Sequence, residues 1–122
     1  MKENVLKIKS YSFALRIVKL HQFLRKEKKE YILSKQILRC GTAIGALIRE
    51  AEFAQSKADF TNKMQIALKE ANETRYWLEI FKDNGYLNDK MFESIKNDCD
   101  ELIQLLVSTV KTSKQRITNS EK

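Results

Sequence analysis

Apolar residues recur along most of the chain at spacings of three and four, the pattern of helices with one buried face. The clearest case lies within residues 57–84, where seven residues step by four and three in alternation: Phe60, Met64, Ala67, Ala71, Thr74, Leu78 and Phe81. A seven-residue repeat held for three heptads is typical of a coiled-coil-like seam. It predicts a long helix that packs against its neighbours over its whole length.

The same periodicity predicts three further helices, at residues 4–27, 31–54 and 89–112. The inward stripe of the first is Phe13, Ile17, Leu20 and Leu24. That of the second is Leu33, Ile37, Cys40, Ile44, Leu47, Ile48 and Ala51, and that of the last is Phe92, Ile95, Cys99, Leu102, Leu106, Thr109 and Val110. Residues 113–122 are polar, and we expect them to form a frayed tail.

Turn signals separate these segments. Ser56 and Asp59 have the spacing of a capping box at the start of 57–84, Gly85 suits the left-handed residue that ends it, and Asn88 is a good N-cap for 89–112. Short links make consecutive helices antiparallel neighbours. The sequence therefore predicts one all-α domain, 1–122, folded as an antiparallel up-down-up-down, left-handed four-helix bundle.

The first three helices carry more apolar surface than one bundle core can cover. Tyr11, Leu15 and Val18 lie opposite the inward stripe of 4–27, and the reverse face of 31–54 holds small residues that let another backbone approach. We therefore expect a homo-oligomer. Its predicted interface residues are Tyr11, Leu15, Val18, Leu38, Thr42, Gly45, Ala46, Arg49, Phe53, Tyr76 and Ile80.

Composition narrows the class of protein. The 122 residues suffice for one core without disulfides or metal, and there are no prolines and only three glycines to interrupt helices. No apolar run reaches the roughly 18 residues of a membrane span, and the N-terminus lacks a signal-peptide core, so we expect a cytoplasmic protein without a membrane partner. Cys40 and Cys99 fall on core-facing positions, which favours buried free thiols.

The net charge of +7 is unevenly distributed. Residues 1–50 hold 12 Lys and Arg against 4 Asp and Glu, whereas residues 51–122 hold 11 against 12. A dense positive surface is all that sequence-independent binding to phosphates requires, although such a stretch can also be ordinary solvated surface. The candidate nucleic-acid-binding residues are Lys19, Arg25, Lys26, Lys28, Lys29, Lys35 and Arg39. Aromatic residues do not interleave with them, so base stacking is not expected.

Signals for catalysis or metal binding are absent from the sequence. A di-metal bundle needs two Glu-x-x-His motifs, but His21 is the sole histidine and residue 18 is valine. No nucleophile motif or phosphate-binding glycine loop is present, so we expect no catalytic site, no cofactor and no metal. Glu50, Glu70, Glu73 and Arg75 lie beside the seam, where they suit ion pairs between helices or subunits, the alternative being contact with a ligand.

Two stretches carry a family resemblance, SKQILRCGTAIGALIREAEFAQSKADF at residues 34–60 and IALKEANETRYWLEI at residues 66–80. They are similar to the four-helix-bundle family of 23S rRNA intervening-sequence proteins, related to the accessory protein of diversity-generating retroelements. The resemblance covers roughly residues 10–110. It implies a homopentamer with a central channel, and partners that include RNA or DNA and a reverse transcriptase or another nucleic-acid-processing protein.

This chain departs from the family pattern at three positions. Cys40, Ala43 and Leu47 stand where the family pattern has two serines and an asparagine, whereas Glu50, Glu70 and Glu73 are retained. If the lost polar groups contact a ligand or line a channel, this chain lacks that contact. The functional hypothesis is a non-enzymatic oligomer that binds RNA or DNA weakly and without sequence specificity. The alternative is a structural or protein-interaction scaffold that binds no nucleic acid.

Overall fold

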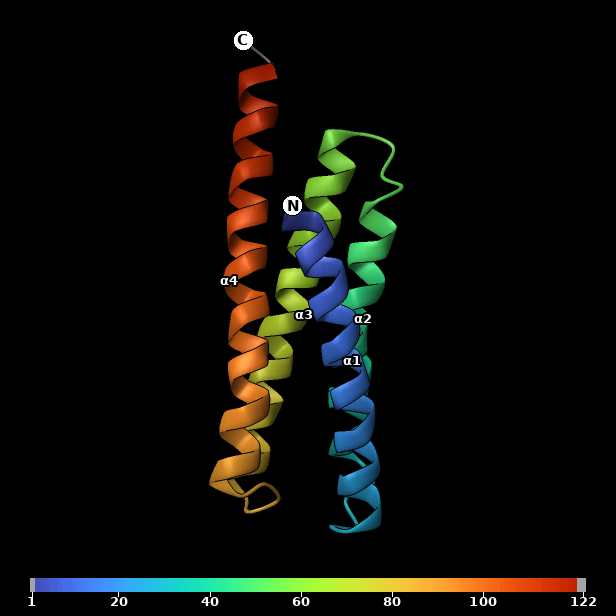
Figure 1. The fold of residues 1–122 in the computed structure, drawn as a ribbon. Helices are drawn as coiled ribbons and strands as arrows, with labels where there is room; N and C mark the ends of the chain where they lie inside the picture. Colours follow the sequence, from blue (N-terminus) through green and yellow to red (C-terminus); the bar gives the residue numbers. More distant parts are fainter. Residues whose placement is uncertain (1, 121–122) are drawn as a thin grey trace.

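The structure, a computed structural model, describes residues 2–120, with side chains from residue 4 onward. It consists of four helices, α1 (Lys2–Lys26), α2 (Leu33–Ala51), α3 (Lys57–Asp83) and α4 (Asp89–Ser120). Each helix runs antiparallel to the next, and α4 returns beside α1 to close a ring of four (Figure 1). The predicted antiparallel four-helix bundle is confirmed. No helix in the described part of the chain is long and apolar enough to span a membrane.

The core is formed by the inward stripes that the periodicity predicts. The seam of α3 is buried from Met64 to Phe81, with Phe60 half-buried at its start. The side chains with the largest buried volume come from all four helices and include Phe13, Ile17, Ile44, Met64, Leu78, Phe81, Leu102 and Leu106. Burial of each such side chain stabilises the fold by about 1.5–3 kcal/mol, so the bundle rests on this shared stripe.

Two glycines set the distance between α1 and α2. A Cβ atom at Gly41 would lie 2.8 Å from the side chain of Ile17, and one at Gly45 would lie 3.4 Å from the carbonyl oxygen of Ser10. The sequence placed Gly45 on a reverse face that meets a neighbouring subunit, and this interpretation needs correction. The backbone that approaches Gly45 closely is that of α1 in the same chain, because α1 crosses this flank of α2.

The predicted helix caps at both ends of α3 are confirmed. Ser56 accepts a hydrogen bond from the Asp59 amide (3.0 Å), and the Asp59 carboxylate accepts one from the Gln55 amide (3.1 Å). At the other end Gly85 has φ 80°, the Tyr86 amide donates to the Phe81 carbonyl, and their rings meet edge to face. This is a Schellman motif with its hydrophobic contact. The Asn88 side chain caps α4 through the Met91 amide (2.8 Å).

Helices α1 and α3 end within two residues of the predicted bounds, whereas α2 and α4 differ more. Helix α2 spans Leu33–Ala51 rather than 31–54, because residues 52–54 form bonds of i to i−3 type that tighten its end. Helix α4 continues to Ser120 instead of ending at residue 112, and its last turns extend past the other helices (Figure 1). Buried Ser113 hydrogen-bonds Thr61, and Lys57 Nζ donates to Ser120 Oγ (2.7 Å). Residues 121 and 122 of the predicted tail lie outside the described residues.

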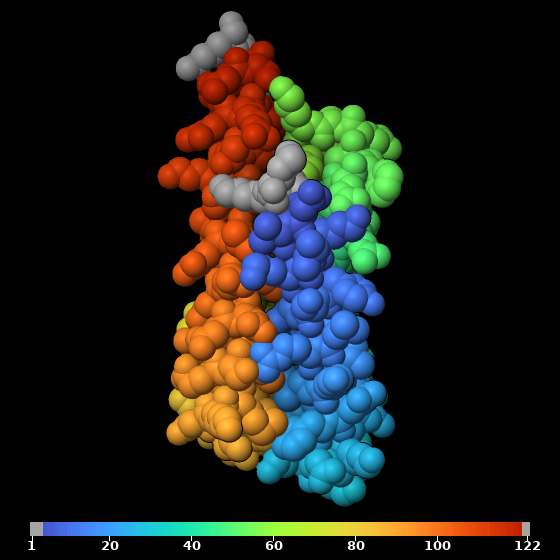
Figure 2. Space-filling view, in the orientation of Figure 1, coloured from blue at the N-terminus to red at the C-terminus, as the bar shows by residue number. Residues whose placement is uncertain are grey.

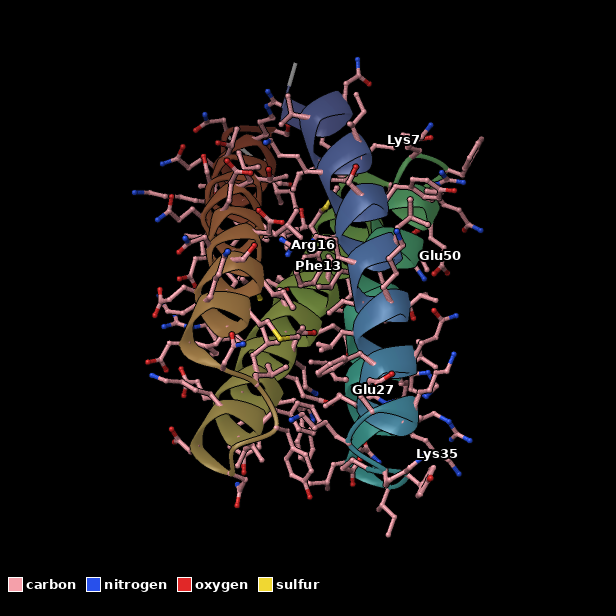
Figure 3. The ribbon with its side chains drawn as sticks, turned by 60° about the horizontal axis from the view of Figure 1, so that its bottom comes forward. Lys7, Phe13, Arg16, Glu27, Lys35 and Glu50 are labelled. Atoms are coloured by element: carbon pink, nitrogen blue, oxygen red, sulfur yellow. The ribbon has the colours of Figure 1, made fainter. Side chains whose placement is uncertain are left out.

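The contact between α1 and α4 is the smallest of the four, and ion pairs lie along its exposed edge. The two helices lie side by side (Figure 2). Arg16 points from α1 toward α4 (Figure 3), where it pairs with Asp98 at 2.6 Å and donates to the Ser94 carbonyl, and Lys9 pairs with Glu101 at 2.8 Å. Such exposed pairs contribute about 0–1 kcal/mol each. The bundle is therefore closed tightly at α1–α2 and weakly at α1–α4.

Gly41→Ala and Gly45→Ala test the close approach of α1 and α2. Both substitutions gain the higher helix propensity of alanine, about 1 kcal/mol. The difference in unfolding free energy between the two variants therefore reports the steric cost of the added methyl group. At Gly41 the new methyl group collides with Ile17, whereas at Gly45 it makes nearly ordinary contact. We expect Gly41→Ala to be about 1–3 kcal/mol less stable than Gly45→Ala in urea unfolding. Equal stability of the two variants would contradict this packing.

Candidate nucleic-acid interface

The turn between α1 and α2 is held by backbone bonds and one carboxylate. The Glu30 amide donates to the Leu24 carbonyl at 2.9 Å, and Lys29 adopts a left-handed conformation with φ 57°. The Glu30 carboxylate then accepts hydrogen bonds from the amides of Leu33 (2.9 Å), Ser34 (2.7 Å) and Ile32 (3.2 Å). These are donors that the first turn of a helix leaves without partners. Glu30 therefore caps α2.

Glu30 is a buried charge directed at the backbone. Its side chain is buried, and burial alone would raise its pKa. The hydrogen bonds from Leu33, Ser34 and Ile32 favour the ionised form more strongly and leave the pKa of Glu30 below its ordinary value. Because this carboxylate faces the helix amides, it does not form ion pairs with the lysines around it.

Five of the predicted basic residues gather around this turn, and we call them the turn surface: Arg25, Lys26, Lys28, Lys29 and Lys35. The first two belong to the last turn of α1 and the last to the first turn of α2, at one end of the bundle (Figure 3). Among residues 4–120 none of the five forms an ion pair. Lys19 is exposed farther back along α1.

The position of Lys35 is informative because a positive charge there does not stabilise α2. Cations near the last turn of a helix are stabilised by the helix dipole, which accounts for Arg25 and Lys26 without any ligand. Lys35 lies instead in the first turn of α2, where a positive charge is mildly unfavourable and where no acidic residue of that turn offsets it. Helix stability therefore does not explain this part of the positive surface.

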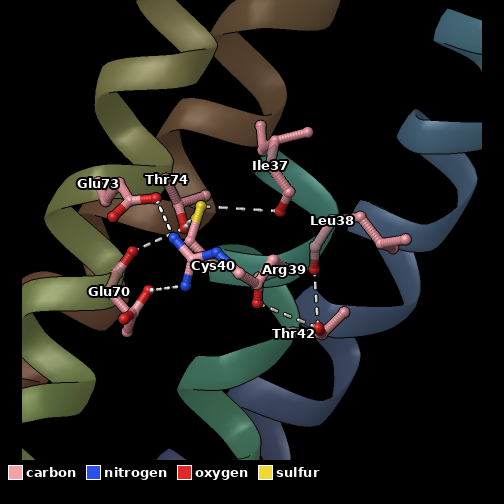
Figure 4. Close-up of polar contacts among 8 residues, drawn as sticks. All are labelled: Ile37, Leu38, Arg39, Cys40, Thr42, Glu70, Glu73 and Thr74. Carbon is pink, nitrogen blue, oxygen red and sulfur yellow. Dashed lines mark hydrogen bonds and ion pairs between the residues drawn. The ribbon is translucent and has the colours of Figure 1, made fainter. Parts of the chain in front are cut away.

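Arg39 is set apart from the turn surface by its partners. Its guanidinium pairs with Glu70 at 3.3 Å and with Glu73, both on α3 (Figure 4). Two carboxylates more than balance its charge, so this place on the surface is not positive. Lys63 likewise pairs with Glu50 (3.4 Å), and Arg75 with Asp100 (2.9 Å). Ion pairs between helices, one of the two roles open for these acidic residues and Arg75, are confirmed.

The expectation that aromatics do not interleave with the basic residues is wrong in space. The Arg25 guanidinium lies 5.4 Å from the ring centroid of Tyr31, and Lys28 Nζ lies 5.9 Å from that of Phe23. The turn folds the chain back, which brings residues six positions apart into contact. Tyr31 is also one of the residues lining a shallow pocket, with His21, Gln22, Arg25, Lys26 and Lys29.

His21 reports a positive environment in this pocket. Its pKa is lowered first by partial burial and then by the charges of Arg25 and Lys35. A protonated imidazole is disfavoured where other cations are close, so His21 is neutral at pH 7. It can donate or accept a hydrogen bond there without adding charge.

The two cysteines are buried, as the sequence predicts. Thr74 donates to Cys40 Sγ at 3.2 Å (Figure 4), and the Cys99 thiol donates to the Ala71 carbonyl at 3.4 Å. Burial raises the pKa of Cys40 to about 11 and that of Cys99 to about 12. Neither is a thiolate at neutral pH. Two departures from the family pattern, Cys40 and Leu47, thus lie in or against the core and take part in packing.

Exposed apolar side chains lie along the outer side of α1, and we call this stripe the outer face: Ile8, Tyr11, Leu15 and Val18. Ile8 is 66% exposed, and on α2 the Arg49 guanidinium lies 5.3 Å from the Tyr11 ring centroid. Of the remaining predicted interface residues, Ala46, Phe53 and Tyr76 are exposed and Leu38, Thr42, Gly45 and Ile80 are half-buried. The sequence analysis missed Ile8, which the periodicity places beside Tyr11.

Comparisons with known proteins agree with this architecture. Residues 2–108 match the family model described as 23S rRNA-intervening sequence protein. A crystal structure at 1.70 Å resolution, of a protein with unknown function from the S23 ribosomal protein family of Bacteroides thetaiotaomicron VPI-5482, is similar at 59% sequence identity with a TM-score of 0.90. The similarity covers 91% of this chain and 99% of that one. No curated protein matches the chain.

Glu30→Gln tests the cap of α2. The carboxylate has a lowered pKa in the folded state, so its contribution to stability is present at neutral pH and is lost as pH falls below about 4. We expect the variant to lose about 1 kcal/mol of unfolding free energy at pH 7. The difference from wild type in urea unfolding should shrink between pH 5 and pH 3. A difference that stays constant down to pH 3 would count against the cap.

Proposed function

The chain belongs to the family of 23S rRNA-intervening sequence proteins, and we propose that it is a non-enzymatic, cytoplasmic protein that binds RNA or DNA without sequence specificity at the turn surface. The supporting observation is a cluster of five basic side chains at one end of the bundle without carboxylate partners among the described residues. Unpaired cations attract phosphates and release the counterions condensed on nucleic acid.

The neighbouring charges favour the turn surface over the rest of the basic half. Arg39 is balanced by two carboxylates, and Lys7, Lys9 and Arg16 are paired with acidic residues. Glu30 is directed at the α2 amides. Within the described part of the chain, five basic side chains thereby remain without ion-pair partners at this turn, where the exposed acidic residue is Glu27, and this is where a polyanion would be held.

The proposal that the protein is not an enzyme rests on the state of its reactive groups. The two thiols are buried with raised pKa values, and His21 has basic and amide neighbours in its pocket rather than a nucleophile or carboxylate. A catalytic histidine needs a partner that it can activate or that orients it. Binding is the role that these groups support.

We also propose that the protein assembles with copies of itself through the outer face, as a homopentamer according to the family resemblance. The large apolar side chains Ile8, Tyr11 and Leu15 are between 50% and 66% exposed, which is costly for a protein that stays monomeric. A ring would repeat the turn surface and raise the affinity for a long polyanion through multivalency. A reverse transcriptase or other nucleic-acid-processing protein is a further proposed partner.

The alternative function is a protein-interaction scaffold without nucleic-acid binding. The observation in its favour is the same outer face, because an apolar surface of this kind can contact a different protein as well as another copy. The scaffold leaves the unpaired turn surface without a role, and for this reason we prefer nucleic-acid binding.

Nucleic-acid binding through the turn surface should depend steeply on salt. With three lysine–phosphate contacts, affinity should fall by about 20- to 40-fold between 50 and 200 mM salt. A triple variant with Lys26→Ala, Lys28→Ala and Lys29→Gly should weaken binding and reduce the slope of log affinity against log salt by about two to three. Glycine is used at position 29 because φ is positive there, so the fold is not strained.

The matched control for this experiment removes three charges at the other end of the bundle. Lys111→Ala, Lys114→Ala and Arg116→Ala lie on the last turns of α4, remote from the turn surface (Figure 1). We expect this variant to retain most of the binding measured by fluorescence anisotropy. Equal losses in both triple variants would assign binding to net charge alone, and no binding at 50 mM salt would overturn the proposal.

Self-assembly through the outer face can be tested with one charged substitution. Leu15→Glu should shift the protein to monomers in light scattering, because a carboxylate would be buried at an apolar interface. Val107→Glu is the control, since Val107 on α4 is 49% exposed and Leu15 is 50% exposed. It should leave the mass unchanged. Monomeric wild-type protein, or equal effects of both substitutions, would contradict this interface.

A further inference from the structure

Tyr31 is an aromatic residue that the core does not use. It is 48% exposed and lies in the turn between α1 and α2, outside both helices. It does not belong to the core cluster or to the side chains packed against that cluster. Arg25 stacks on the ring at 5.4 Å. With nearly half of the residue open, at least part of the ring remains available for a second planar group.

The surroundings of this ring suit a phosphate as well as a planar group. Arg25, Lys26 and Lys29 line the same shallow pocket as Tyr31, and Gln22 and His21 add an amide and an imidazole. The pocket has a volume of about 600 Å³, within the usual range of small-ligand sites. Cations and an open aromatic ring in one pocket match the two parts of a nucleotide.

Duplex and single-stranded nucleic acids differ in what they offer such a pocket. Both present phosphates, but a duplex keeps its bases stacked inside, whereas a single strand can place an unpaired base on an aromatic ring. Stacking of this kind does not depend on the identity of the base, so it is compatible with binding that lacks sequence specificity. The aromatic ring would be superfluous in a site that only neutralised phosphates.

We infer that this pocket holds an unpaired nucleotide of single-stranded RNA or DNA, with its base stacked on Tyr31 and its phosphates contacted by Arg25, Lys26 and Lys29. The inference rests on the proposed function and narrows it from any polyanion to a single strand. Gln22 lies at the rim, where its amide reaches the edge of the base or the sugar. His21, neutral at pH 7, supplies a hydrogen bond without altering the charge.

The test compares single strands with an abasic strand of equal length and charge, and with a duplex of equal length that carries about twice the charge. Anisotropy is measured at 50 mM salt with a labelled oligoadenylate 12-mer as RNA and as DNA, an abasic DNA backbone of the same length, and a duplex of that length. We expect the single strands to bind about tenfold or more tightly than the abasic strand, from one stacked base. The tighter of the RNA and DNA strands identifies which nucleic acid the site prefers.

Three variants assign the effect to the ring. Tyr31→Leu should abolish the advantage over the abasic strand and leave abasic binding unchanged, whereas Tyr31→Phe should retain the advantage. Ile32→Ala is the control, because it removes a 77% exposed apolar side chain from the same turn, and it should change nothing. Because Tyr31 is outside the core, we expect the leucine variant to fold, and its urea unfolding curve checks this.

The outcomes separate the inference from the function on which it rests. Salt-dependent binding in which the single strand has no advantage over the abasic strand would overturn the stacking site and leave the proposed polyanion binding intact. An advantage of the single strand that survives Tyr31→Leu would also overturn it, because the base would then stack elsewhere. No binding of any strand would overturn the proposed function together with the inference.

Discussion

The cap that Glu30 provides is the interaction on which the geometry of the candidate site depends. The turn between α1 and α2 contains neither glycine nor proline, and it places Lys29 in a left-handed conformation that costs about 1–2 kcal/mol. One buried carboxylate bonded to the Ile32 amide and to the first two amides of α2, with the Glu30 amide bonded to Leu24, fixes the turn against that strain. It also directs the Glu30 carboxylate at the backbone, and in the described part of the chain none of the lysines around it pairs with it.

Periodicity predicts the fold well because the apolar positions of a buried helical face recur every three or four residues, whichever element packs against that face. The α3 seam and the α4 stripe follow this rule. The pattern does not tell which flank of α2 a neighbour crosses, and so Gly45 was assigned to another subunit although α1 covers it. The length of α4 depends on Ser113 meeting Thr61 of α3, and such a contact between distant residues leaves no trace in a local window.

Prediction of the candidate site from the sequence is limited in the same way. Counting charge gives Arg39 and Lys35 equal weight, but Glu70 and Glu73 lie on another helix and balance only Arg39. The periodicity predicts Tyr31 as the first residue of a helix. Because Glu30, which is not a usual N-cap residue, starts α2 at Leu33, Tyr31 belongs to the turn and folds back onto Arg25. The position of Tyr31 in the pocket depends on the Glu30 cap and therefore cannot be predicted from the periodicity.

The outer face and the turn surface lie on different parts of the bundle. Glycines bring α1 and α2 close together, whereas exposed ion pairs lie along the edge between α1 and α4. The turn surface lies at the end of the bundle, beyond the outer face (Figure 3). Copies that pack side by side through the outer face would therefore not cover it. In a closed ring with the helices along its axis, symmetry would place every turn surface on one rim, so assembly would concentrate the positive charge.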